Sequence, residues 1–186
     1  AAHAGTMPMG MRRDSLRAMS RFALELAEIG KRHNGVTTVG SVSAWPGVVT
    51  AVPGTTTCTM DMRHIDAEAL AAMYGEMKAA AQAAAEAEGC TVELEHIFRI
   101  PPMIFDATLV DSVRRAVKAV EGHEFSLPSG ALHDASEMAR VVPTAMVFTS
   151  SIAGLSHTKE EDTPDEHLAM GITAFHQAVM EAVNPA

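Results

Sequence analysis

Hydrophobic residues recur at helical spacing in two segments of the N-terminal half of the chain. The segments run from Arg12 to about Lys31 and from Ala67 to about Glu88, and each predicts a helix with one buried face. Asp66 can cap the second helix, and Gly35 and Gly89 end the two segments. The apolar positions are Leu16, Met19, Phe22, Ala23, Leu26 and Ile29 in the first segment, and Leu70, Met73, Met77, Ala80 and Ala84 in the second.

Three further segments predict β-strands. Val36 to Trp45 is rich in β-branched residues and is followed by Pro46-Gly47, which is typical of a strand that ends in a turn. Thr55 to His64 alternates in polarity, so Cys58 lies on the buried face and Arg63 on the opposite one. Cys90 to Ile100 predicts a third strand. The order helix, strand, strand, helix, strand predicts a ferredoxin-like split βαβ unit that lacks its first strand.

The missing strand would precede Thr6, so we expect the chain to be a fragment that begins within a larger fold. In the predicted register Cys58 and Cys90 both face the helices. This favours two buried free thiols over a disulfide, and with them a reducing, cytoplasmic location.

Pro101-Pro102 interrupts the pattern and predicts a boundary between domains at 1–102 and 103–186. The second part alternates predicted helices and strands, which indicates part of an α/β layer. Its expected elements are a helix from Asp106 to about Val120, a strand at Glu124 to Leu127, a short helix opened by Asp134-Ala-Ser-Glu137, a buried strand at Val141 to Thr149 and a final helix opened by Thr163-Pro-Asp-Glu166.

Composition narrows the classes of function. The 186 residues are 47% hydrophobic, as expected of a globular protein. The net charge is −9, with 23 acidic against 14 basic residues, which disfavours nucleic acid as a partner. No apolar stretch approaches the roughly 18–20 residues that cross a bilayer, so we expect a protein that does not enter the membrane.

Four places combine polar side chains with loops or strand ends, where α/β proteins carry their chemistry. They are His3 ahead of the first helix, Arg63 at the end of its strand, Ser129-Gly-Ala-Leu-His133-Asp134, and His157 after Gly154. Each has a structural alternative. His3 can be a solvated terminal residue, Arg63 can pair with Asp61, Asp134 can simply cap a helix, and a lone His157 can have no role.

Taken together, these places resemble the zinc-dependent amidohydrolases that include N-carbamoyl-L-amino-acid hydrolase, β-ureidopropionase and allantoate amidohydrolase. That group is related to the dinuclear-zinc aminopeptidases and aminoacylases. The resemblance covers nearly the whole chain. It rests on His-Ala-Gly-Thr-x-Pro-Met-x-x-Arg-x-Asp at 3–14, Val-Pro-Gly to Asp-x-Arg at 52–63, Ser-Gly-Ala-x-His-Asp-Ala at 129–135 and Gly-Leu-Ser-His-Thr-x-Glu-Glu at 154–161.

The resemblance implies that residues 1–102 are a ferredoxin-like lid used for homodimerisation. Residues 103–186 would then be the C-terminal piece of an α/β zinc-hydrolase domain. It also implies a small-molecule substrate and two divalent ions, zinc or manganese. Most of the metal ligands, together with the carboxylate that activates water, would lie in a missing N-terminal part. The implied reaction is metal-assisted hydrolysis of a linear C–N bond, ureido or amide.

The resemblance also implies roles for single residues. His157 would be a metal ligand, and His3 would reach into the partner subunit's site to stabilise an oxyanion. Arg63 would bind the substrate carboxylate, for which its planar fork suits it better than Lys. Backbone groups of Gly130, Ala131 and Leu132 would contact substrate.

The chain departs from the family pattern at two positions. Thr50 stands where the family has Asn, and Leu132 stands where it has Gly, so the substrate stays open. Two alternative functions also remain: an aminoacylase or dipeptidase of the same superfamily, and a non-catalytic dimerising lid fragment.

Overall fold

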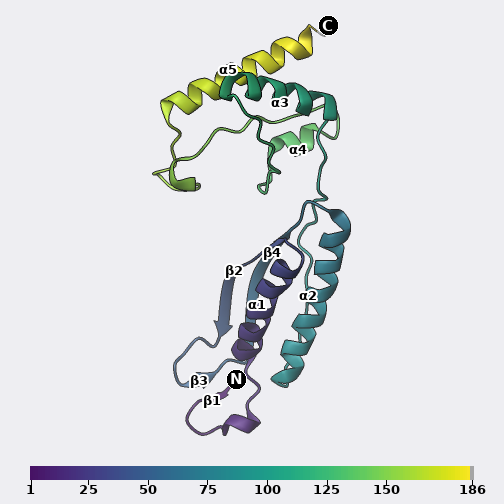
Figure 1. The fold of residues 1–186 in the computed structure, drawn as a ribbon. Coiled ribbons are helices and arrows are strands. Elements are labelled where there is room, and N and C mark those ends of the chain that lie inside the picture. Colours follow the sequence, from purple (N-terminus) through teal and green to yellow (C-terminus); the bar gives the residue numbers. More distant parts are fainter. Residues whose placement is uncertain (185–186) are drawn as a thin grey trace. The chain divides into compact units, whose positions relative to one another are not determined.

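The computed structural model describes residues 1–184, and the chain divides into two compact units, Ala1–Pro102 and Met103–Ala186. Figure 1 traces both units from the purple N-terminus to the yellow C-terminus. Each unit has its own small cluster of buried apolar residues. Helices and short sheets make this a mixed α/β protein.

The two long helices of the first unit form where the apolar periodicity predicts them. Helix α1 spans Ser15–Arg32 and helix α2 spans Ala67–Ala87. The Asp14 carboxylate accepts hydrogen bonds from the amides of Leu16 and Arg17, and that of Asp66 accepts one from Ala69. These caps satisfy amides that have no partner within the first turn.

Two antiparallel strands lie beside the helices (Figure 1). Strand β2 spans Val36–Trp45 and pairs with β4, Thr55–Arg63, so that Trp45 is opposite Thr55 and Val36 is opposite Arg63. The register shifts between Val39 and Ser41. Both strands match their predicted positions to within one residue.

The core of the first unit lies between the helices and one face of this sheet. Leu26, Ile29 and Met73 are its largest fully buried side chains. Cys58 and Met60 of β4 pack against it, as the alternation of the strand predicts. The buried members are Met19, Phe22, Leu26, Ile29, Met73, Met77, Ala81 and Ala84.

The strand predicted at Cys90 to Ile100 is wrong, because residues 90–100 form no ladder in the structure. Val92 packs against the core and the His96 ring stacks on Tyr74 at 5.6 Å, but most side chains of the segment are exposed. A strand exists only through hydrogen bonds to a neighbour. In a split βαβ sheet the last strand pairs with the first, and among residues 1–184 no strand fills that position.

A second pair of very short strands lies near the Trp45–Thr55 end of the main sheet. Strand β1, Ala2–His3, pairs antiparallel with β3, Ala51–Val52. The amide of Gly54 donates to the carbonyl of Trp45 at 3.0 Å, which ties β3 to the end of β2. Between β1 and α1 lies a 3₁₀ turn, η1, at Met9–Met11.

The second unit is built on two helices that pack together, α3 at Ala107–Glu121 and α5 at Asp165–Val183. Ala116, Ala174 and Ala178 are buried at their contact, where small side chains let the helices approach closely. Asp106 caps α3 by accepting the amide of Leu109 at 3.0 Å. A short helix, α4, spans Asp134–Met138, and a second 3₁₀ turn, η2, spans Ile152–Gly154.

Two predicted strands of this unit are also wrong. Residues 124–127 and 141–149 are irregular in the structure, and several of their large side chains are exposed, including Phe125 at 69% and Phe148 at 52%. One backbone bond, from the amide of Asp106 to the carbonyl of Thr144, holds the second segment to the start of α3. Neither segment has a strand beside it in the described part of the chain.

The two predicted caps are displaced by one residue. His133, and not Asp134, caps α4, because its imidazole Nδ1 accepts the amide of Ala135 at 3.0 Å. Helix α5 begins after Pro164, which provides no side-chain cap, while the Thr163 hydroxyl donates to the carbonyl of Ser150.

Cys58 and Cys90 are free thiols, as predicted, although both are half-buried rather than fully buried. Within residues 1–184, no helix combines the length and apolar character that a membrane crossing requires.

Candidate functional site

His3 lies at the end of strand β1, on a loop that folds back on itself. The amide of Gly5 donates to the imidazole Nδ1 at 3.1 Å, and the amide of Met7 donates to the His3 carbonyl at 3.2 Å. Because an amide N–H can only donate, Nδ1 carries no proton, and the neutral ring holds its proton on Nε2. His3 is exposed.

The structure brings His3 and Thr50 together. His3 is opposite Ala51 in the β1–β3 pair, and the amide of Ala4 donates to the Thr50 carbonyl at 2.8 Å. Two sequence segments that lie almost fifty positions apart therefore meet at one end of the first unit. Hydrogen bonds from the amide and the hydroxyl of Ser15 to the Pro53 carbonyl, both 3.2 Å, anchor this end to the start of α1.

Arg63 lies at the opposite end of the sheet. It is the last residue of β4, whereas the β1–β3 pair adjoins the first residue of β4, Thr55. Eight residue steps of a strand span about 26 Å. The Arg63 Nε donates to Asp61 Oδ2 at 2.5 Å, so the predicted structural alternative, pairing with Asp61, is present in the structure.

The predicted substrate loop, Gly130 to Leu132, precedes α4 and is exposed. The Ser129 hydroxyl donates to the carbonyl of Ala131 at 3.0 Å, and Leu132 is 61% exposed. His133 faces the helix through Nδ1, in the same way that His3 faces Gly5. Both imidazoles therefore keep the Nε2–H tautomer when neutral.

His157 occupies an exposed loop between η2 and α5. Its φ of 59° lies in the left-handed region, which non-glycine residues rarely adopt, and its amide donates to Glu161 Oε2 at 2.9 Å. The amide of Ile152 donates to the Asp162 carbonyl at 2.8 Å and closes the loop. The Glu161 carboxylate and this closure hold the imidazole at the surface.

The described residues contain no group of three or more His, Cys, Asp or Glu side chains that would hold a metal ion. His157 is therefore one donor and not a complete site. The donor set of residues 1–184 does not fit a metal centre without further ligands.

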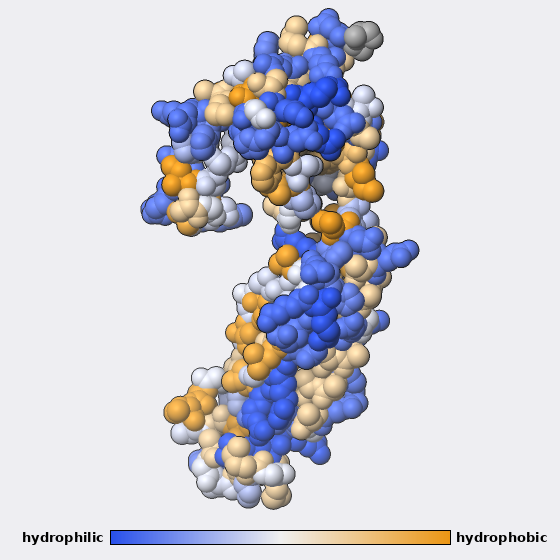
Figure 2. Space-filling view, in the orientation of Figure 1, coloured by the Kyte–Doolittle hydropathy of each residue, from blue (hydrophilic) through white to orange (hydrophobic). Residues whose placement is uncertain are grey.

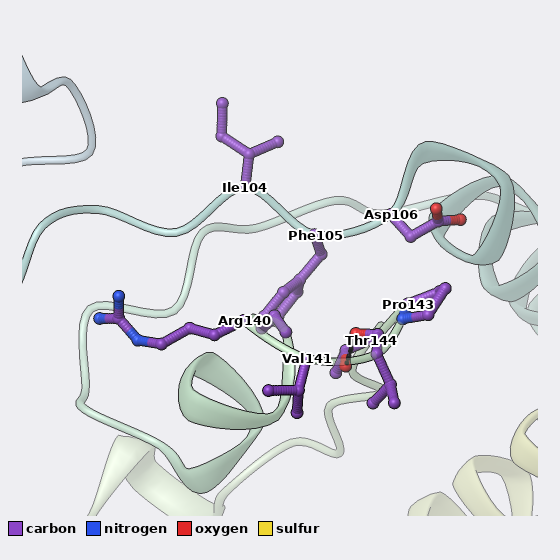
Figure 3. A pocket seen from close by; sticks show the side chains of 9 residues that line it. Ile104, Phe105, Asp106, Arg140, Val141, Pro143 and Thr144 are labelled. Carbon is purple, nitrogen blue, oxygen red and sulfur yellow. Dashed lines mark hydrogen bonds between the residues drawn. The ribbon is translucent and has the colours of Figure 1, made fainter.

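The hollow drawn in Figure 3 does not coincide with any predicted site residue. It measures about 390 Å³ and lies between residues 104–106 and 139–144. Its charged groups are used in the fold, because Asp106 caps α3 and Arg140 pairs with Glu137 at 2.9 Å. In Figure 3 the Arg140 side chain extends away from Asp106, so the two do not form a charge pair. This hollow carries no evident chemistry.

Sequence reasoning assigned no role to Arg12, although it belongs to the first motif. In the structure its guanidinium bonds two carbonyls of the His3 loop, those of Ala4 at 2.6 Å and Met7 at 3.0 Å. The sequence signal was the position of Arg12, which follows the segment with His3 and Gly5 and lies two positions before the helix cap Asp14.

Curated relatives match the chain almost from end to end. It is 34% identical over 183 residues to an N-carbamoyl-L-amino-acid amidohydrolase of Rhizobium meliloti, covering 97% of this chain and 44% of the relative. It is 35% identical over 172 residues to the allantoate amidohydrolase of Escherichia coli, covering 91% of this chain and 42% of that one. The chain thus spans less than half the length of the curated relatives it matches.

A solved structure gives the same result. An amidase of the hydantoinase/carbamoylase family from Burkholderia multivorans superposes with a TM-score of 0.92 at 35% identity, over all of this chain and 46% of the other. The sequence model of peptidase family M20/M25/M40 matches residues 10–181, which is most of the chain. The chain therefore belongs to peptidase family M20/M25/M40.

Proposed function

We propose that this chain is part of a metal-dependent hydrolase that cleaves a linear C–N bond, ureido or amide, in substrates of the N-carbamoyl amino acid type. The names of the relatives support this substrate class, since they include N-carbamoyl-L-amino-acid and allantoate amidohydrolases. The observation that carries the proposal is the β1–β3 pairing, which joins His3 to the segment of Thr50.

In this proposal His3 donates its Nε2–H to the carbonyl oxygen of the substrate as negative charge develops there. A positioned neutral donor stabilises such an oxyanion without having to reorganise during the reaction. The Gly5 amide supports this role because it occupies Nδ1 of an exposed ring and so leaves the proton of the neutral imidazole on Nε2. Thr50, whose carbonyl accepts the amide of Ala4 next to His3, also contacts the substrate in this proposal. So does the backbone of Gly130, Ala131 and Leu132.

Arg63 binds the α-carboxylate of the substrate. Arginine offers a planar fork of donors that matches a carboxylate. Asp61 holds the guanidinium by Nε at 2.5 Å, which restricts its orientation at the end of the strand. The substrate carboxylate then joins Asp61 as a further acceptor for the guanidinium.

We further propose that His157 supplies one ligand to a site for two divalent ions, zinc or manganese. The remaining ligands would come from parts of the protein beyond these 186 residues, because the relatives are more than twice as long as the aligned region. In the full-length protein His157→Ala should lower metal content and turnover together. Normal metal content in this variant would remove His157 from the ligand set.

The distance between His3 and Arg63 supports a homodimer with shared sites. His3 belongs to the β1–β3 pair that adjoins Thr55, whereas Arg63 ends β4, a strand about 26 Å long, so we infer that one copy of the sheet does not place both residues on a small substrate. We propose that each active site uses Arg63 of its own subunit and His3 of its partner. The exposed apolar side chains, seen as orange areas in Figure 2, are compatible with such contacts.

Mixing variants tests this arrangement. His3→Ala and Arg63→Ala full-length proteins should each be inactive, but mixed dimers contain one site with both residues intact. Random reassociation at equal amounts should restore about a quarter of wild-type activity, because about half of the dimers are mixed and each has one competent site. No recovery after confirmed subunit exchange would contradict sharing of this kind.

The substrate class has its own test. Hydrolysis of an N-carbamoyl-L-amino acid releases the amino acid, ammonia and carbon dioxide, whereas hydrolysis of an N-acyl amino acid or a dipeptide releases no ammonia. Ammonia release by the full-length, metal-loaded protein from carbamoyl substrates or allantoate is the expected result. Cleavage of acyl substrates alone would instead identify an aminoacylase or dipeptidase.

A further inference from the structure

The Arg12 side chain bonds the backbone of the loop that carries His3 at two places. The Arg12 guanidinium donates from Nη2 to the Ala4 carbonyl at 2.6 Å and from Nε to the Met7 carbonyl at 3.0 Å. These two carbonyls lie on either side of Gly5, whose amide binds the His3 imidazole. Arg12 is half-buried, which favours hydrogen bonds to the backbone over bonds to water.

We propose that Arg12 is a positioning residue that fixes the orientation and tautomer of His3. The catalytic importance of that tautomer rests on the proposed function, whereas the contact between Arg12 and the loop does not. A planar guanidinium can bond both carbonyls at once, and so it fixes the Ala4–Gly5 peptide group, which contains the Gly5 amide, relative to the Met7–Pro8 peptide group. The Gly5 amide then remains aimed at Nδ1, and the imidazole presents Nε2–H.

The packing around Gly5 supports a closely fitted arrangement. A Cβ atom at this position would lie 3.3 Å from His3 Cε1 and 3.5 Å from Nδ1. Glycine therefore lets the peptide approach the ring closely enough for the hydrogen bond to form. Gly5→Ala should displace the imidazole by a few tenths of an ångström and weaken the same hydrogen bond.

The chain offers an internal reference for the tautomer. His64 Nδ1 accepts the amide of Asp66 at 2.8 Å, and its Nε2 donates to the carbonyl of His33 at 2.9 Å. This ring has the same Nε2–H tautomer as His3, but it lies at the Arg63 end of the sheet and has no contact with Arg12. It should respond to unfolding and not to the loss of Arg12.

Two-bond ¹H–¹⁵N correlation of the histidine rings in the 186-residue chain measures the tautomer without substrate or metal. With the rings neutral, we expect wild-type His3 to show protonated Nε2 and unprotonated Nδ1, its signals being assigned by their loss in His3→Gln. Arg12→Met should move both His3 nitrogens toward averaged shifts while His64 keeps its signature. Arg13→Met is the matched control, since it removes a neighbouring charge that makes no bond to the loop.

Unchanged His3 shifts in Arg12→Met, or a proton on Nδ1 in the wild type, would overturn the inference. If the Arg12→Met protein unfolds, His64 loses its signature as well, and the Arg12→Lys protein is then measured in place of Arg12→Met. Lysine is a point donor without the fork, so we expect a partial shift toward the averaged values, and unchanged shifts would overturn the inference there as well.

Activity of the full-length protein separates this inference from the proposed function. Arg12→Met should lower kcat by about ten- to a hundredfold with little change in KM, because an oxyanion donor acts in the transition state. One outcome is that His3→Gln and Arg12→Met both retain full kcat, while the ¹⁵N shifts of the His3 ring still change in Arg12→Met. The positioning by Arg12 then stands, and the catalytic role of His3 fails.

Discussion

Residues at the proposed site make hydrogen bonds to groups close to them in sequence. His3 is bound by Gly5, His157 by Glu161 and Arg63 by Asp61, all within four positions. Such local contacts form without the remainder of the molecule. The side chains of His3 and Arg63 and the backbone of His157 are therefore held by local contacts in this chain, whereas in our proposal the complete site also uses groups from elsewhere.

Arg63→Lys in the full-length protein tests the proposed carboxylate contact. A lysine ammonium cannot form two parallel bonds to a carboxylate, so kcat/KM for carbamoyl amino acids should fall by roughly thirtyfold, about 2 kcal/mol. The loss should appear mainly in KM, with metal content unchanged. Steady-state kinetics beside metal analysis gives both values, and unchanged kcat/KM would mean that Arg63 has a structural role, of which its ion pair with Asp61 is a part.

The two thiols provide a prediction on pH. Burial raises the pKa of Cys58, and burial together with the charges of Glu88 and Asp14 raises that of Cys90. Because the folded state favours the protonated thiols, their contribution to stability is complete below the ordinary thiol pKa. It is lost as the pH rises through that value toward the raised one. Alkylation rates followed against pH should reach half-maximum at higher pH in the native chain than in urea, and coincident profiles would contradict this.

Elements of the first unit depend on a few positions that face its core. Leu26 of α1 is 1% exposed, whereas Leu24, two positions earlier, is 74% exposed. Because both residues are leucines on the same helix, a comparison of their variants measures the effect of burial alone.

Leu26→Ala should lower the free energy of unfolding by about 2–5 kcal/mol, because the cavity at a buried position is not refilled. Leu24→Ala should change it by less than about 0.5 kcal/mol. Urea denaturation monitored by helical circular dichroism compares the two variants. Equal effects would mean that α1 does not bury this face in solution.

Two glycines provide a second matched pair. A Cβ at Gly35 would lie 2.7 Å from the Met73 side chain and 3.0 Å from the Arg63 carbonyl, whereas one at Gly75 in α2 would meet nothing within 4 Å. Gly35→Ala should destabilise the chain by about 1–3 kcal/mol through overpacking. Gly75→Ala should stabilise it by about 0.5–1 kcal/mol, since alanine restricts the unfolded chain. Thermal unfolding should therefore shift in opposite directions, and a common direction would contradict the packing.

The whole molecule consists of two compact units, each with a modest core and many exposed large apolar side chains. Val49 at 96% and Ile104 at 90% exposure are the extremes, one in each unit. Apolar surface on this scale is typical of a chain that associates with other polypeptide.

One chain has a mass of 19.7 kDa. The proposed homodimer therefore predicts a particle of twice that mass in solution. Light scattering at tens of micromolar should give this value, because an isologous contact pairs the same surface of both copies. Reversible dissociation on dilution is consistent with the dimer. A monomer over the whole range would contradict it and, with it, the sharing of His3 between subunits.

The sequence by itself determined the helices, the β2–β4 hairpin and the candidate residues. Helices α1, α2, α3 and α5 satisfy their backbone within the segment, so apolar periodicity and an Asp cap suffice to locate most of them. Strands β2 and β4 are separated in the chain only by a short segment that contains β3, and they pair directly. The motifs singled out His3, Arg63 and His157, because their residue types are unusual in small-residue loops and at a strand end.

Only the tertiary structure decided what depends on distant partners. Residues 90–100, 124–127 and 141–149 have strand-like sequences but no ladder, because a strand requires a neighbour that no local pattern supplies. The meeting of His3 with Thr50 and the two bonds of Arg12 arise from chain folding around η1. Periodicity locates an element that bonds to itself, whereas contacts between remote segments are determined by the packing of the whole unit.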